Sequence, residues 1–121
     1  MRYTRVFADP DGETHFEDAE TSGETIRVSE SDLVGTVSET FPVRGVYFRE
    51  VVEESSPVPH NAPFPLFIIG LRGTFSVEVS DGETREFPPG SVVLVEDTGG
   101  KGHITRRVGD EPRATLMGPL A

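Results

Sequence analysis

Cysteine and tryptophan are absent from this 121-residue chain, and lysine occurs once, at Lys101. The lack of cysteine excludes disulfides, thiolate metal sites and cysteine nucleophiles. Basic side chains are scarce: 11 stand against 21 acidic ones, which gives a formal charge of −10. Because a chain with this charge repels phosphate backbones, we expect no nucleic-acid partner.

Long apolar runs and helical periodicity are also missing. No apolar segment approaches the roughly 20 residues needed to cross a bilayer, so we expect no membrane partner. Residues 1–10 lack the basic and then apolar pattern of a secretory signal, and a cytoplasmic protein is the expectation. The length suits one domain spanning residues 1–121.

What the sequence does contain is a series of short apolar runs separated by glycine and proline, a pattern typical of β-strands. Asp81-Gly82, between two such runs, is a strong hairpin signal. A short helical turn could begin at residues 31–34, although Gly35 argues against extending it. Strands are predicted at residues 2–7, 25–29, 45–52, 66–71 (covered on both faces), 74–80, 83–87, 92–95, 103–108 and 113–117. So many closely spaced strands favour an all-β sandwich or barrel.

The stretch from His60 to His103 resembles the cupin family of small β-barrels. In the first cupin motif, His60 takes the first histidine place, but Ala62 and Leu66 stand where the family has a second histidine and a glutamate. In the second motif, His103 matches the histidine if the preceding loop carries two extra residues, and Arg107 replaces an asparagine.

This resemblance covers residues 43–117, the barrel motif region, and residues 1–42 form an N-terminal arm with further strands. It implies a cupin-type double-stranded β-helix, or jelly-roll barrel, of the kind found in small bacterial cupins. Small cupins are often homodimers, so a homodimer is expected. The fold alone does not name an activity, because one fold hosts many functions.

A metal site is weakly supported. Metal-binding cupins hold one divalent ion with three histidines and a glutamate, and this chain keeps only His60 and His103 of that set. Tight binding would need a further ligand, such as Glu96, Asp97 or His15. No cofactor is firmly predicted, and a divalent metal remains possible.

Two facing imidazoles can transfer protons without a metal, because histidine titrates near neutrality. A carboxylate from Glu96 or Asp97 could orient one of the rings. We therefore predict a metal-independent isomerase, lyase or cyclase acting on a small molecule, with His60, His103, Glu96 and Asp97 as catalytic residues. The alternatives are a ligand-binding cupin without catalysis, a metal-dependent enzyme with an unconventional ligand set, or histidines with no functional role.

Three further residues are candidates for ligand binding. Lys101 lies in a glycine-rich loop whose backbone N–H groups could cradle an anion, although a solvated turn is the plainer interpretation. Thr105 and Arg107 share a strand face with His103 if residues 103–108 are extended. Arg107 could then bind a substrate carboxylate, with surface ion pairing as the alternative.

Overall fold

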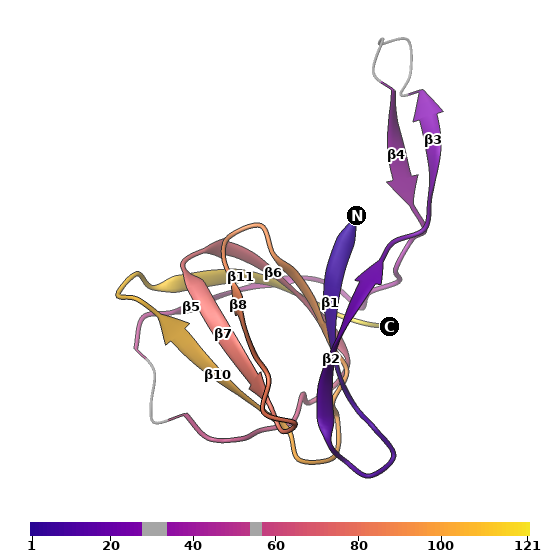
Figure 1. Ribbon diagram of the computed structural model, residues 1–121. Coiled ribbons are helices and arrows are strands. Elements are labelled where there is room, and N and C mark those ends of the chain that lie inside the picture. Colours follow the sequence, from indigo (N-terminus) through magenta and orange to yellow (C-terminus); the bar gives the residue numbers. More distant parts are fainter. Residues whose placement is uncertain (28–33, 54–56) are drawn as a thin grey trace.

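The computed structural model describes residues 1–27, 34–53 and 57–121. These residues form eleven strands and no helix, so the predicted all-β class is confirmed (Figure 1). The strands are β1 (Arg2–Ala8), β2 (Thr14–Glu20), β3 (Gly23–Arg27), β4 (Val34–Ser38), β5 (Tyr47–Val51), β6 (Leu66–Arg72), β7 (Thr74–Val79), β8 (Thr84–Phe87), β9 (Val92–Val95), β10 (His103–Val108) and β11 (Arg113–Pro119). None of the described residues forms a helix of the length and apolarity that crossing a membrane requires.

The strands pair into three sheets. The largest has the order β2-β1-β9-β6-β11-β5, and a three-stranded sheet has the order β10-β7-β8. In Figure 1 these two sheets wrap around a common interior, while β3 and β4 form a separate two-stranded hairpin that projects from the body. Within the larger sheet only β1 and β9 run parallel.

The hydrophobic core lies between the two larger sheets. Alternating residues of β7 supply Phe75, Val77 and Val79, each at most 4% exposed, as the strict alternation of residues 74–80 predicts. Val6 on β1 and Val93 on β9 face them from the other sheet, and both are fully buried. The predicted hairpin at Asp81-Gly82 is present, since β7 and β8 pair antiparallel and Gly82 adopts a φ of 99°.

The sequence does not predict β2 or β4, and the predicted cover of β6 on both faces is only partly correct. The sequence of β2 is mostly polar, because β2 is an edge strand, and every residue of β4 is exposed. Residues 66–70 are buried or half-buried, but the predicted cover on both faces does not reach Leu71, which is 49% exposed. Phe41 does pack against Phe67 on the outer face, but that cover does not extend to Leu71. Residues 31–33 of the possible helical turn lie outside the described residues, and Val34 begins β4.

Candidate functional site

His60 and His103 lie side by side. They exchange two backbone hydrogen bonds, with N···O distances of 3.0 and 2.9 Å, and their ring centroids are 4.5 Å apart. Gly102 permits this approach: its φ is 76°, and a Cβ there would lie 2.5 Å from the carbonyl oxygen of His60. His103 is 6% exposed, whereas His60 is exposed, so one ring of the pair is buried and the other reaches solvent.

Asp97 stands behind His103. Its Oδ2 lies 2.6 Å from Nδ1 of His103, and its side chain is fully buried. The backbone of Asp97 is fixed as well, because its carbonyl oxygen accepts a hydrogen bond from the amide of Ala62 at 3.1 Å. A carboxylate at Nδ1 keeps the proton on that nitrogen and leaves Nε2 of a neutral ring as the acceptor.

One oxygen of Asp97 is left unpaired. Oδ1 is buried and accepts no hydrogen bond from the part of the chain that the structure describes. Burying a polar atom without a partner costs free energy, so such atoms are rare and call for an explanation other than stability. For Asp97 that explanation is the orientation of the His103 ring, which its other oxygen contacts.

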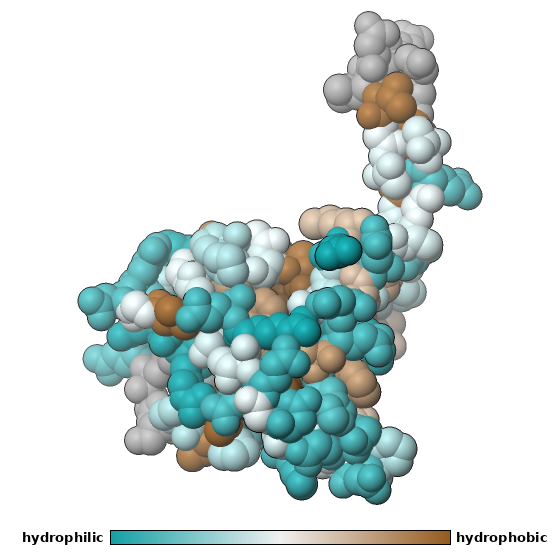
Figure 2. Space-filling view, in the orientation of Figure 1, coloured by the Kyte–Doolittle hydropathy of each residue, from teal (hydrophilic) through white to brown (hydrophobic). Residues whose placement is uncertain are grey.

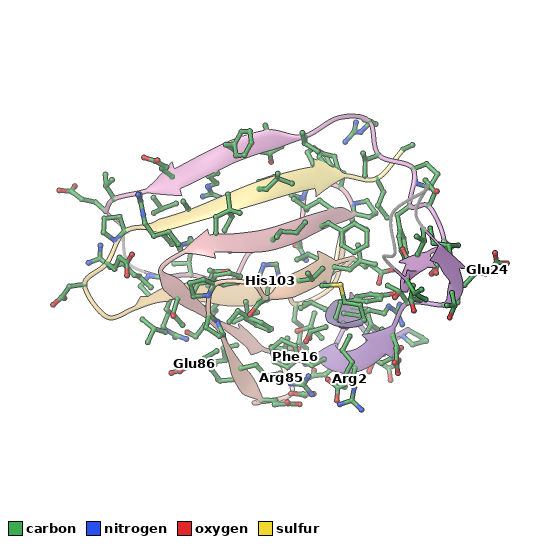
Figure 3. All side chains as sticks on the ribbon, turned by 90° about the horizontal axis from the view of Figure 1, so that it is seen from above. Arg2, Phe16, Glu24, Arg85, Glu86 and His103 are labelled. Atoms are coloured by element: carbon green, nitrogen blue, oxygen red, sulfur yellow. The ribbon has the colours of Figure 1, made fainter. Side chains whose placement is uncertain are left out.

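The histidine pair opens onto a cavity of about 280 Å³ between the two larger sheets. Apolar side chains such as Leu66, Val77 and Val93 form much of its wall, and the hydroxyl-bearing Thr105 lines it as well. Figure 3 shows His103 well inside the outline of the strands, whereas Arg2, Glu24 and Glu86 lie at the periphery. The arrangement is a small chamber whose lining is partly apolar and partly polar, and ligand sites likewise combine apolar walls with a few placed polar groups.

The structure does not bring Glu96 to the histidines. Val95 points into the cavity, so its neighbour Glu96 points to the opposite face of the sheet, where its Oε1 accepts a hydrogen bond from Nε of Arg5 at 2.6 Å. Glu17 pairs with the same guanidinium at 2.7 Å. Glu96 and then Glu17 raise the pKa of Arg5, and the three side chains form one ion-pair network.

Lys101 and Arg107 are not among the residues that line the cavity. Lys101 is exposed and pairs with Glu13 at 2.5 Å, a contact that raises the pKa of Lys101. Arg107 donates a hydrogen bond to the carbonyl oxygen of Val52 at 3.0 Å. Of the three predicted ligand-binding residues, Thr105 alone lines the cavity.

Two arginines at the cavity were not predicted. Arg49 and Arg113 both line it, one from β5 and one from β11. The alternation of residues 45–52 places Arg49 and Val51 on one face and Phe48 on the other, and the more apolar side would ordinarily face the core. The structure has the reverse: Phe48 is 71% exposed.

No protein-family model matches this chain, and no curated protein matches it. The geometry of the site therefore carries the functional interpretation.

The donor set does not fit a metal-binding cupin centre. Ala62 and Leu66 are each 4% exposed and offer no ligand atom. His15, a possible recruit, instead contacts Asp9 and Asp81 through its two ring nitrogens. Across residues 1–27, 34–53 and 57–121, no group of three or more histidine or acidic side chains is arranged to hold a metal ion.

Proposed function

We propose that this chain is a cupin-type barrel enzyme that moves protons on a small molecule without a metal ion, as an isomerase, lyase or cyclase. The observation that carries the proposal is the pair His60 and His103, 4.5 Å apart between ring centroids, at an interior cavity and backed by the buried Asp97. The cupin assignment is supported by two sheets that surround one core and by histidines at two of the family's ligand places.

In this proposal His103 is the general base. The Asp97 carboxylate holds Nδ1–H, so Nε2 accepts the substrate proton, and the same carboxylate stabilises the imidazolium that forms. The bond is short, at 2.6 Å between Nδ1 and Oδ2, as charge-assisted hydrogen bonds are.

His60 is the general acid. Its ring stands next to that of His103 and is exposed, so it can exchange protons with solvent and return one to the substrate. A second ring at this distance also lets the proton arrive on a different atom or face from the one that lost it. That separation of base and acid is what an isomerase, lyase or cyclase requires.

The first test is proton exchange, which can be observed even when the product of the reaction is unidentified. The purified chain is incubated in D2O with a panel of small C–H acids (2-oxo acids, hydroxy acids and hydroxyketones), and deuterium incorporation is followed by NMR. We expect incorporation into at least one compound class, unaffected by EDTA. His103→Ala and Asp97→Asn should each lower the rate by about 10²–10⁴-fold, the usual contribution of a general base.

Glu96→Gln is the matched control, because Glu96 is adjacent in sequence but lies on the other face of the sheet. Its exchange rate should equal that of the unaltered chain. If no compound exchanges although one binds in the cavity, the chain is a binding protein rather than an enzyme. If EDTA abolishes exchange and a divalent ion restores it, the metal-free mechanism is wrong.

A further inference from the structure

The cavity has a cationic end that the proposed proton transfer does not use. Arg113 lies opposite Val51 on β5, and Thr115 lies opposite Arg49, so the two arginines are diagonal neighbours on one face of the sheet. Diagonal neighbours are about 7–8 Å apart, within reach of long side chains. One anionic group in the cavity can therefore contact both guanidinium groups.

This cationic end is distant from the histidines. The guanidinium of Arg113 lies 5.6 Å from the centroid of the Phe75 ring. Phe75 pairs with Arg107 across β7 and β10, four residues along the ladder from the pair formed by Val79 and His103. Four residues of strand span about 13 Å. The arginines and the histidines thus mark opposite ends of one chamber.

Apolar side chains form part of the wall between the two ends. Val77, Ile68, Val93 and Met117 belong to it, and Thr105 and Thr115 add hydroxyl groups. The volume of about 280 Å³ matches on the order of nine water-sized groups at about 30 Å³ each. A ligand that fills it has a short carbon chain.

Among the described residues, arginines outnumber carboxylates in the cavity lining, whereas the molecule as a whole is acidic. The chain carries −10 overall, and the described lining holds the exposed Arg49, the half-buried Arg113 and one carboxylate, the exposed Glu53. Guanidinium groups bind carboxylates through paired N–H donors. A neutral or cationic ligand gains nothing from this end.

We infer that the ligand is a small organic acid, with its carboxylate held by Arg49 and Arg113, a short apolar chain along the wall, and its reacting carbon beside the His60 and His103 rings. The reacting end rests on the proposed function, and the carboxylate end does not. The inference therefore names a substrate class that the histidine pair alone leaves open.

The first experiment compares three probes of matched length on the unaltered chain. Binding of hexanoate, 1-hexanol and hexylamine is measured by NMR titration. We expect hexanoate to bind at least about tenfold more tightly than the other two, because only its carboxylate pairs with the arginines. Equal binding of hexanoate and 1-hexanol would overturn the inference without any variant.

A pair of arginine variants then locates the anion. Arg49→Gln should weaken hexanoate by about tenfold and leave 1-hexanol unchanged. Arg72→Gln is the control, since Arg72 is exposed on β6, two strands from β5, and lies outside the cavity lining. It should change neither affinity. If both variants weaken hexanoate equally, the effect is one of surface charge and the assigned carboxylate site is wrong.

His103→Ala separates this inference from the proposed function. The variant should lose deuterium exchange and keep hexanoate binding, because the anion is held at the far end. Tight hexanoate binding without exchange in any compound would refute the proton transfer and leave the ligand class standing. Exchange with no preference for the acid would refute the ligand class alone.

Discussion

His15 joins two loops through both of its ring nitrogens. Nε2 lies 2.7 Å from Oδ2 of Asp9, and Nδ1 lies 2.8 Å from Oδ2 of Asp81, in the turn between β7 and β8. Both nitrogens can donate only when the ring is protonated. The Asp9 and then the Asp81 contacts raise the pKa of His15. Contact with His15 lowers the pKa of Asp9, and the backbone amide of Glu83 and then His15 lower the pKa of Asp81.

The sign of the resulting pH dependence follows directly. A raised histidine pKa adds stability that is full below the ordinary value of 6.5 and is lost as the pH rises through the raised pKa. The lowered carboxyl pKa values add stability that is lost only when the pH falls below their ordinary value of 3.8. We predict that His15→Gln lowers the melting temperature more at about pH 5.5 than at about pH 9. Thermal melts followed by circular dichroism would show it, and an equal loss at both pH values would contradict the charged contact.

The sequence predicted only part of the set of residues at the candidate site. The resemblance to the two cupin motifs singled out His60 and His103, and Asp97 followed from its nearness to His103. Glu96 was indistinguishable from Asp97 by spacing, because which of two adjacent side chains points inward depends on how the strand ends. Arg49 was missed because the exposed Phe48 occupies the opposite face, where the core would be expected.

At the scale of strands and turns, alternation and turn residues predicted most of the body. β7 and β8 follow from apolar residues at every second position and from Asp81-Gly82. β2 and β4 were not predicted, because an edge strand or a projecting hairpin needs no apolar face and leaves no such pattern. The backbone bridge between His60 and His103 depends on a positive φ at Gly102, which no local sequence pattern predicts.

Substitutions at Gly82 and Gly102, which both have positive φ, distinguish the cost of backbone strain from the cost of a steric clash. Gly82→Ala meets no atom within 4 Å, so its cost is that of the left-handed backbone alone, about 1–2 kcal/mol. Gly102→Ala has a similar backbone cost and also places a Cβ 2.5 Å from the carbonyl oxygen of His60. We predict a larger loss of unfolding free energy for Gly102→Ala in urea, together with shifted imidazole NMR signals for His60 and His103. Equal costs with unchanged imidazole signals would mean that this close approach does not position the pair.

At the scale of the whole molecule, the projecting hairpin of β3 and β4 is the feature that the body does not explain. Val34 and Val37 are 60% and 51% exposed, and Figure 2 shows hydrophobic side chains on this arm beyond a mostly hydrophilic body. A two-stranded hairpin alone is marginally stable in water, so an arm with apolar residues on both faces needs a packing partner. The body offers apolar surface in Phe48, 71% exposed on the edge strand β5, and in Leu71, 49% exposed on β6.

We predict that the arm holds a homodimer together by packing on the body of a second copy. Ser22 and Glu39 close the base of the arm through a backbone hydrogen bond of 3.2 Å and a side-chain bond of 2.7 Å. Residues 23–38 can therefore be replaced by a short glycine linker without moving the strands of the body. The full chain should be a dimer in sedimentation equilibrium, and the shortened chain a folded monomer, because the core residues of the body are all retained.

Phe48→Ser should also weaken the dimer, since it removes apolar surface that the arm would cover. A monomeric full chain would refute the dimer, and a shortened chain that stays dimeric would show that the two copies meet elsewhere.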